Sequence, residues 1–279
     1  KKNLFFAAKK KKLPKILVAV HFGGLPCEMQ EIYKLSKKYK FKILEDASHS
    51  LGGMYKGEKI GSCKWSDVTV FSFHPVKTIT TAEGGMAVTN NKKIYKELLK
   101  LRNNGITKDI GDFEKKIKSI WYYEQQSLGF NYRMNELEAS LGLTQLKRIK
   151  KFIKERNLIS KRYMYLLKDT PLQLPLIRGY NYSTFHLFVV RFKSKLLKKY
   201  SYDKFFNYIR KLGVGINLHY LPIHLQPYFR NLGFKENYCV NAEQFSKEAI
   251  SLPIYVGLKI KEQKKVVKIL VDLISKKTK

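Results

Sequence analysis

Acidic residues and cysteines are both scarce in this chain of 279 residues. Only 22 residues are Asp or Glu, against 55 that are Lys or Arg, so the formal net charge is +33. The three cysteines, Cys27, Cys63 and Cys239, are widely spaced and form no CxxC pair. Such a sparse, odd set argues against a disulfide framework and against a cysteine-based metal site, and it favours the reducing cytoplasm.

Long apolar runs are absent as well. No stretch approaches the roughly 18 apolar residues of a membrane span, so we expect no membrane partner. The apolar run 4–8 is shorter than the core of a signal peptide, which takes about 7–15 residues, and lysines at 9–12 interrupt it. With 44% hydrophobic residues, a chain of this length can form one large domain or two smaller ones.

Arginine is rare among the basic residues, because only nine of the 55 are Arg. A large positive charge can indicate a protein that binds nucleic acid or another polyanion. Phosphate recognition favours the planar arginine fork, however, and here the lysines are spread over several predicted helix surfaces. We therefore expect no nucleic-acid partner, and a positive field that attracts an anionic substrate such as a nucleotide diphosphate. A polyanion-binding protein is the alternative.

Short apolar runs alternate with a helical pattern in the first half of the chain. Residues 15–20 form a β-rich run, residues 27–39 carry apolar residues at helical spacing, and residues 41–44 form a second β-rich run. A strand, a helix and a strand within about thirty residues are typical of a βαβ unit with parallel strands. Further strands are expected at residues 68–73 and 86–89.

The second half has a different pattern. We expect residues 1–149 to form an α/β large domain with a mainly parallel sheet, and residues 150–279 to form a smaller α+β domain. The expected helices are 135–148, 149–168, 205–212 and 261–276, and the expected strands are 184–192 and 214–219.

Three polar residues follow the predicted strands of the large domain. Asp46 comes after the run 41–44, Ser72 ends the strand 68–73, and Lys77 lies five residues later. Ligands of parallel sheets bind beyond the carboxyl ends of the strands, so these side chains could point into one crevice. Pyridoxal phosphate (PLP) needs such a set: a lysine for an imine, an Asp for the pyridinium nitrogen and hydroxyls for the phosphate. On the residues alone, however, a lysine that follows a strand is usually a surface lysine.

Five segments, in order, resemble motifs of the DegT/DnrJ nucleotide-sugar aminotransferases, a family of PLP-dependent transferase fold type I. The segment around Lys77 reads FSFHPVKTITTAEGG, and the segment around Asp46 reads EDASHSLG. The other three read GFNYRMNE at 129–136, HYLPIH at 219–224 and SLP at 251–253. Some members of this group carry His in place of the lysine and act as dehydratases, so Lys77 favours transamination.

The resemblance implies a role for each motif residue. Lys77 would form the imine with the cofactor aldehyde, and Asp46 would bond the pyridinium nitrogen. His49 would lie beside the ring near its phenolic oxygen, and Ser72 would bond the phosphate. Asn131 would reach the cofactor of the neighbouring subunit, which makes a homodimer the working unit. No metal is implied.

The segment 219–228, with the other motifs, is most similar to the transaminases of pseudaminic acid biosynthesis. The resemblance implies L-glutamate as amino donor and a UDP-linked 4-keto-6-deoxy sugar as acceptor. Another nucleotide keto sugar is the alternative. His219, Tyr220 and His224 could line the sugar site, although a structural role in the loop is as consistent with both histidines.

One family segment precedes the part seen here. It supplies a Gly-Ser/Thr phosphate turn and a residue against the cofactor face, and this sequence starts after both. We expect a fragment of an intact enzyme, because residue 1 is Lys and not Met. A truncated, non-catalytic homologue or regulatory subunit is the alternative.

Overall fold

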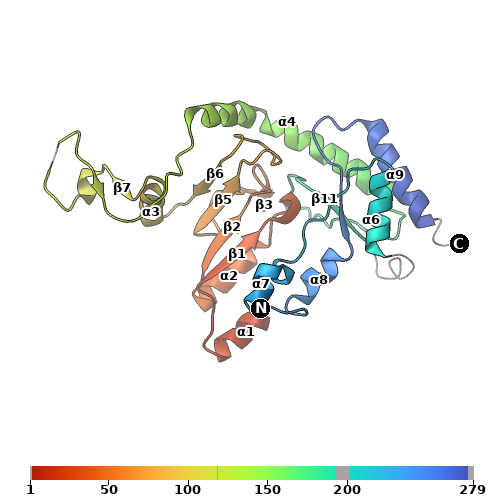
Figure 1. Cartoon of the computed structure of the whole chain (residues 1–279), viewed down its shortest axis with the longest axis horizontal. Coiled ribbons are helices and arrows are strands. Elements are labelled where there is room, and N and C mark those ends of the chain that lie inside the picture. Colours follow the sequence, from red (N-terminus) through yellow and green to blue (C-terminus); the bar gives the residue numbers. More distant parts are fainter. Residues whose placement is uncertain (1, 118, 193–200, 276–279) are drawn as a thin grey trace. The chain divides into compact units, whose positions relative to one another are not determined.

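The computed structural model describes residues 2–117, 119–192 and 201–275, and the chain packs as two compact units (Figure 1). Unit 1 comprises Lys1–Lys150 with Tyr180–Tyr182, and unit 2 comprises Lys151–Gly179 with Ser183–Lys279. The units are defined by packing alone. The assignment of a cofactor-binding domain to 1–149 and of a small domain to 150–279 therefore stays a prediction.

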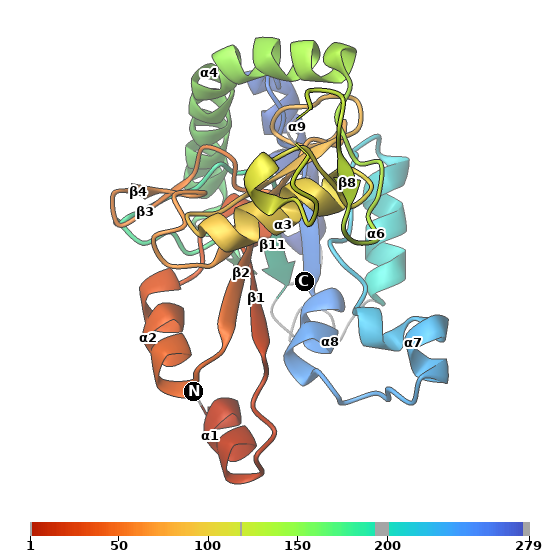
Figure 2. The same cartoon turned by 90° about the vertical axis from the view of Figure 1, so that its left-hand side faces the viewer.

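A four-stranded sheet organises unit 1, in the order β1-β2-β5-β6. Its strands are β1 (Ile16–Val20), β2 (Lys42–Asp46), β5 (Val68–Ser72) and β6 (Gly85–Val88). The first three run parallel, and β6 is antiparallel to β5. Helix α2 (Met29–Tyr39) joins β1 to β2 and lies beside them in both views (Figures 1 and 2), which confirms the βαβ unit and the mainly parallel sheet.

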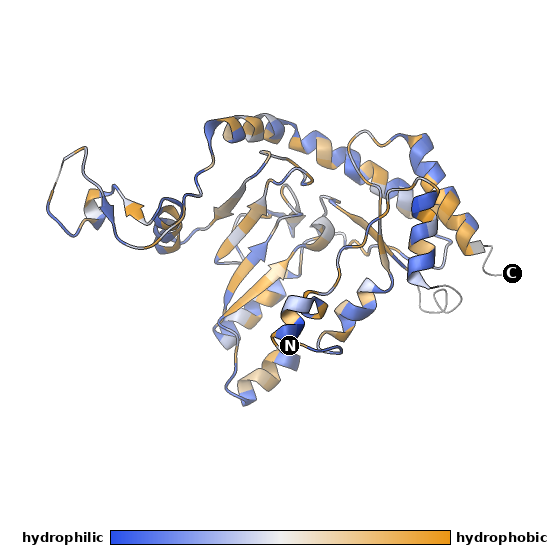
Figure 3. Ribbon diagram, in the orientation of Figure 1, coloured by the Kyte–Doolittle hydropathy of each residue, from blue (hydrophilic) through white to orange (hydrophobic). Residues whose placement is uncertain are grey.

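The two faces of this sheet differ in burial. Ile43 and Glu45 on β2 share the buried face with Thr69 and Phe71 on β5. On the opposite face, Val18 and Val20 are 52% and 48% exposed. Figure 3 shows β1 mostly in the colours of hydrophobic residues. The more exposed face is the one on which the candidate site lies.

The rest of unit 1 consists of short elements around this sheet. The helices are α1 (Lys2–Lys9), η1 (Phe22–Gly24), α3 (Lys92–Arg102) and η2 (Ile110–Asp112). The strands are β3 (Met54–Tyr55), β4 (Glu58–Lys59), β7 (Ile106–Thr107), β8 (Glu124–Gln125) and β10 (Asn181–Tyr182). Residues 103–117 and 119–134, which we call the arm, extend from α3 away from the sheet (Figure 1).

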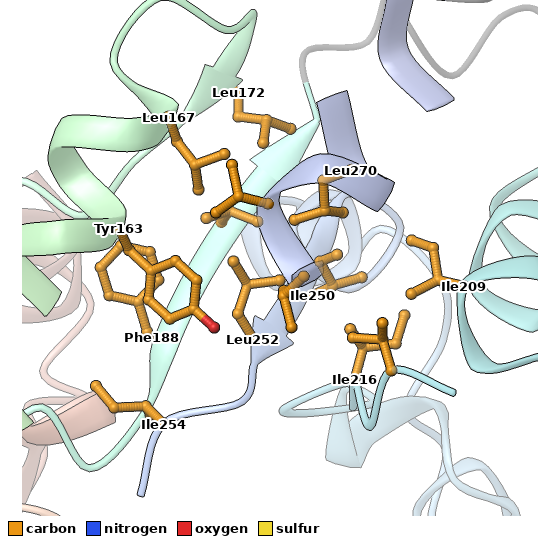
Figure 4. Close-up of a cluster of buried hydrophobic side chains, with 14 of the residues drawn as sticks. Tyr163, Leu167, Leu172, Phe188, Ile209, Ile216, Ile250, Leu252, Ile254 and Leu270 are labelled. Carbon is orange, nitrogen blue, oxygen red and sulfur yellow. The ribbon is translucent and has the colours of Figure 1, made fainter. Parts of the chain in front are cut away.

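Unit 2 packs helices on a three-stranded antiparallel sheet of order β12-β11-β9. The strands are β9 (Leu172–Gln173), β11 (Phe188–Phe192) and β12 (Ala249–Leu252). The helices are α6 (Tyr202–Lys211), η3 (Ile223–Leu225), α7 (Pro227–Asn231), α8 (Val240–Ser246) and α9 (Ile260–Ser275), together with the second half of α4 (Glu136–Leu167). Apolar side chains of α4, α6 and α9 form one core with those of β9, β11 and β12 (Figure 4).

Four expected elements differ from the structure. The two helices expected at 135–148 and 149–168 are one helix, α4, because no Gly or Pro near residue 148 ends it. The strand expected at 214–219 is reduced to a single bridge between Asn217 and Ser251, since the amide of Ile216 donates locally to Val214. The strand expected from 184 begins at Phe188.

Arg156 explains why that strand begins late. Its buried guanidinium donates from one nitrogen to the carbonyls of Phe185, His186 and Ile254, at 3.0–3.2 Å. Carbonyls that bond to a side chain are taken out of the ladder, so residues before Phe188 do not pair as strand.

No described helix is long and apolar enough to cross a membrane.

Truncating Phe188 should destabilise unit 2. This ring is fully buried and packs 4.9 Å from the ring of Tyr163, so Phe188→Ala should lower the free energy of unfolding by about 3–5 kcal/mol. Urea denaturation followed by circular dichroism measures the change. Leu176→Ala is the control, because Leu176 is 74% exposed. Equal effects of the two substitutions would contradict this packing.

Candidate functional site

Asp46 and Ser72 lie on one face of the unit 1 sheet, at its carboxyl edge. Asp46 is the last residue of β2 and pairs with Val70 on the parallel strand β5. Ser72 ends β5 two residues later. Because side chains alternate between faces with a period of two, Asp46, Val70 and Ser72 share a face. The register thus brings together the carboxylate and the hydroxyl that the sequence singled out.

The carboxylate of Asp46 is held by its own turn. The backbone N–H and the hydroxyl of Ser48 both donate to Oδ1 of Asp46, at 3.0 and 2.6 Å. Two donors on one oxygen fix the rotation of the carboxyl group at low entropic cost. The half-buried Asp46 therefore presents its charge in a defined direction from the end of β2.

Lys77 lies in the turn that follows β5, and its ammonium is electrostatically coupled to Asp46. Burial lowers the pKa of the Lys77 amine below its usual value, and the negative charge of Asp46 partly opposes this by raising it. Because the pKa is lowered, more of the amine is neutral than in a solvated lysine. The assignment of Lys77 and Asp46 to one cofactor site stays a prediction.

His49 is buried and has a defined hydrogen-bonding state. The backbone N–H of Gly23 donates to its Nδ1 at 3.2 Å, so the neutral ring carries its proton on Nε2. The ring lies 6.3 Å from that of Phe22. Gly23 has φ 64°, a conformation that favours glycine, and so the turn η1 aims its amide at the histidine. His49 can therefore act as a donor through Nε2.

A buried pair behind Asp46 was not anticipated from the sequence. His21 Nε2 lies 2.8 Å from Glu45 Oε2, and His21 Nδ1 accepts from the amide of Cys27, so Nε2–H is the donor to the carboxylate. Ser66 and Thr69 donate to the other oxygen of Glu45. An acidic residue in the apolar run before Asp46 is the signal that could have indicated this network, because a buried carboxylate needs partners.

Asn131 lines a cleft of unit 1 that includes Gly85, the strand partner of Ser72. The cleft, of about 490 Å³, is lined by the loop 131–134 and by Glu83, Gly84 and Gly85, the end of the Lys77 motif. Asn131 forms a bridge with Asn103, and Arg133 donates to the side chain of the same Asn103. The structure therefore brings two of the sequence motifs together. The predicted contact of Asn131 with a neighbouring subunit's cofactor stays a prediction.

The three candidate sugar-site residues lie in unit 2 and have different surroundings. His219 Nδ1 is 2.7 Å from the hydroxyl of Ser251, which joins the HYLPIH and SLP motifs. Tyr220 is 54% exposed. His224 is buried, with Nε2 2.8 Å from Glu243, and this bond lowers the pKa of the Glu243 carboxyl. Tyr220 and His219 are thus better placed for a ligand than His224, whose contacts hold the loop.

The residues of unit 1 fit PLP by the chemistry of their donors. The cofactor has an aldehyde, a ring nitrogen that must be kept protonated, a phenolic oxygen and a phosphate. The site offers a partly neutral amine, an oriented carboxylate, an imidazole N–H and a hydroxyl on one sheet edge. Among the residues that the structure describes, no cluster of three or more His, Cys, Asp or Glu could hold a metal ion.

Residues 7–271 match the DegT/DnrJ/EryC1/StrS aminotransferase family. The chain belongs to this family. A UDP-4-amino-4,6-dideoxy-N-acetyl-beta-L-altrosamine transaminase of Campylobacter jejuni is 34% identical over 259 residues, which is 92% of this chain and 65% of the relative. An uncharacterised protein of Methanocaldococcus jannaschii, MJ1066, is 37% identical over 86% of this chain and 62% of its own length. The chain thus spans less than two thirds of these relatives.

Solved structures of the family share the fold. Helicobacter pylori PseC, described as an aminotransferase of pseudaminic acid biosynthesis, superposes with a TM-score of 0.85 at 29% identity, over 95% of this chain and 68% of PseC. The PLP form of a putative sugar aminotransferase of Streptococcus pneumoniae, Spr1654, superposes with a TM-score of 0.83 at 27% identity. The match covers 94% of this chain and 69% of Spr1654. The fold is that of the PLP-dependent aminotransferases of fold type I, as expected from the motifs.

Replacing Glu45 by Met should destabilise unit 1 without touching the site itself. Met has no carboxylate to accept from His21 Nε2–H or from the hydroxyls of Ser66 and Thr69, and His21 Nδ1 is already occupied by the Cys27 amide. The loss of the hydrogen bond from His21 should lower the free energy of unfolding, measured by urea denaturation, by about 1–3 kcal/mol. Glu58→Gln, which removes an exposed ion pair with Lys64, should cost about 0–1 kcal/mol. A Glu45 variant as stable as the Glu58 variant would refute the network.

Proposed function

We propose that this chain is a PLP-dependent aminotransferase that moves an amino group from L-glutamate to a nucleotide-linked 4-keto-6-deoxy sugar. The observation that carries the proposal is the register that places Asp46 and Ser72 on one face at the carboxyl edge of the sheet, with the half-buried Lys77 in the turn that follows. Membership of an aminotransferase family supports a cofactor-binding role for Lys77 and Asp46 over a structural one.

Bound PLP would supply an electron sink for the carbon that loses and gains a proton. Lys77 would hold the cofactor covalently through its aldehyde. The carboxylate of Asp46, oriented by Ser48, would keep the ring nitrogen protonated, and Nε2–H of His49 would donate toward the phenolic oxygen. The hydroxyl of Ser72, at the end of β5, would donate to the phosphate.

The amine of Lys77 is also the group that would carry the proton between donor carbon and cofactor. A general base must be neutral to accept a proton, and an unperturbed lysine is charged at neutral pH. Burial lowers the pKa of Lys77, so its neutral fraction grows at a lower pH than in a solvated lysine. The activity should accordingly rise with pH as this amine loses its proton.

The sugar is best assigned from the relatives and from the unit 2 loop. Relatives from C. jejuni and H. pylori are named as transaminases of UDP-4-amino-4,6-dideoxy-N-acetyl-beta-L-altrosamine, at 34% and 32% identity. We assign as acceptor the UDP-linked 4-keto sugar that corresponds to this amino sugar, with Tyr220 and His219 as its contacts. Another nucleotide keto sugar is the second candidate, because SpsC of Bacillus subtilis, a spore coat polysaccharide biosynthesis protein, is 32% identical.

A homodimer is the proposed working unit. Apolar side chains are strongly exposed on the arm and on the first half of α4, and contiguous exposed apolar surface marks interaction sites. The exposed set is Ile120, Trp121, Tyr123, Leu128, Phe130, Tyr132, Leu137, Leu141, Leu143 and Leu146. Asn131 belongs to the same arm, so a second copy docked there would meet the residue expected to serve its cofactor.

Loss of either Lys77 or Asp46 should abolish amino transfer. Lys77→Ala and Asp46→Asn should lower the rate of amino transfer from glutamate to the UDP-linked keto sugar by at least about 100-fold. Asn at position 46 keeps an oxygen for the Ser48 donors and removes only the charge. Lys92→Ala, on the exposed start of α3, is the control. Substantial activity of Lys77→Ala would disprove the assignment.

A charge on the exposed apolar surface should break the dimer. Leu128 and Leu137 are 88% and 84% exposed, so Leu128→Asp with Leu137→Asp should leave each subunit folded but weaken association roughly 100-fold. Light scattering after size-exclusion chromatography measures the mass. Leu176→Asp in unit 2, which is 74% exposed, should remain dimeric. A monomeric wild type, or a dimeric double variant, would contradict the proposal.

A further inference from the structure

A second cavity of unit 1 lies at the edge of the sheet opposite to Asp46 and Ser72. It has a volume of about 460 Å³ and is formed by the end of α2, the start of β2 and the turn before β5. This volume falls within the roughly 300–1,000 Å³ of small-molecule sites. One five-residue strand, about 13 Å at 3.3 Å per residue, separates the starts of β2 and β5 from their carboxyl ends. The cavity is thus distinct from the candidate cofactor site.

Positive charge dominates the lining of this cavity, which we call the basic pocket. Its principal residues are Tyr33, Lys37, Lys40, Lys42, Lys64 and Trp65. Asp67 is the only carboxylate in the lining, and it pairs with Lys42 at 3.0 Å. Lys64 pairs with Glu58, which lies outside the pocket. Within the part of the chain that the structure describes, Lys37 and Lys40 form no ion pair, so two charges are uncompensated.

Aromatic rings hold two of these ammonium groups in place. The Nζ of Lys37 lies 4.7 Å from the ring centre of Tyr33, and the Nζ of Lys64 lies 5.3 Å from that of Trp65. The two rings are themselves packed edge to face, 5.6 Å apart. Cation–π attraction favours an ammonium over an aromatic face. The lysines therefore gather around one aromatic pair, where charge repulsion alone would drive them apart.

The dipole of α2 explains only part of this arrangement. Lysines in the last turn of a helix are favoured by the negative end of its dipole, and this accounts for Lys37. Lys42 is on β2, and Lys64 precedes β5, so neither gains from the helix end. Lysines from three separate segments converge on one cavity. Such a cluster of positive charges is suited to binding a multivalent anion.

We propose that the basic pocket is a second binding site, for a small phosphate-bearing anion. Lysine ammonium groups bind phosphate as point charges, and a doubly charged phosphate would compensate the two unpaired lysines, Lys37 and Lys40. The anion is an inorganic phosphate or the phosphate of a nucleotide. The site is independent of the proposed aminotransferase activity and of its cofactor.

Trp65 offers a reporter that is specific for this pocket. The chain has two tryptophans, Trp65 in the pocket and Trp121 on the arm. Protein labelled with 5-fluorotryptophan gives two ¹⁹F signals, which Trp121→Phe assigns. The whole chain is titrated with sodium phosphate, and separately with uridine monophosphate, with chloride at matched ionic strength as reference. The Trp65 signal should shift saturably with phosphate and not with chloride, whereas the Trp121 signal should not respond.

Charge removal then locates the binding. The double variant Lys37→Gln with Lys40→Gln should raise the midpoint of the Trp65 shift at least about tenfold, since both uncompensated charges are lost. Lys92→Gln with Lys93→Gln removes two exposed charges from α3 in the same unit and should leave the midpoint unchanged. Both variants should keep the aminotransferase activity of the unaltered chain.

The two titrations distinguish the sources of the anion. Equal midpoints for phosphate and uridine monophosphate support a site for the phosphate group alone, and a lower midpoint for the nucleotide supports a nucleotide site. A Trp65 signal that does not shift, that shifts equally with chloride, or that shifts equally in the Lys37/Lys40 variant overturns the proposal. None of these outcomes depends on PLP or on amino transfer, so the proposed function is tested separately.

Discussion

The parallel pairing of β2 with β5 is the constraint on which the rest of the site depends. It sets Asp46 beside Val70 and so places the Asp46 carboxylate and the Ser72 hydroxyl on one face at one sheet edge. Lys77 follows in the short turn after β5. A shift of one residue in this register would send Asp46 to the opposite face. The proposed chemistry therefore rests on a backbone hydrogen-bond pattern.

Buried polar contacts hold this sheet edge in place from behind. Glu45, the neighbour of Asp46, bonds to His21 on the opposite face, and the amide of His21 donates to the carbonyl of Asp46. The same turn supplies the Gly23 amide that orients His49. The sequence around His21 thus acts on the cofactor side through backbone and side chain together. The positions of Asp46 and His49 thus depend on these contacts as well as on the residues themselves.

The parallel strands, the βαβ unit and the residues at the strand ends could be predicted, because apolar runs and their polar ends are local signals. Details that depend on distant partners could not. Arg156, almost thirty positions earlier in the chain, donates to the carbonyls of Phe185 and His186. The strand is therefore shorter than expected. The His224–Glu243 pair, which ties His224 to α8, is equally invisible in a motif. The continuity of α4 was missed because a break was placed where no Gly or Pro occurs.

The central claim is that Lys77, among the many lysines of this chain, is the one that bonds to PLP. Incubation with PLP, reduction with borohydride, protease digestion and mass spectrometry would locate the bond directly. The account predicts a single modified peptide, which contains Lys77, at one cofactor per chain. Modification spread over several surface lysines, or on a peptide that lacks Lys77, would contradict it.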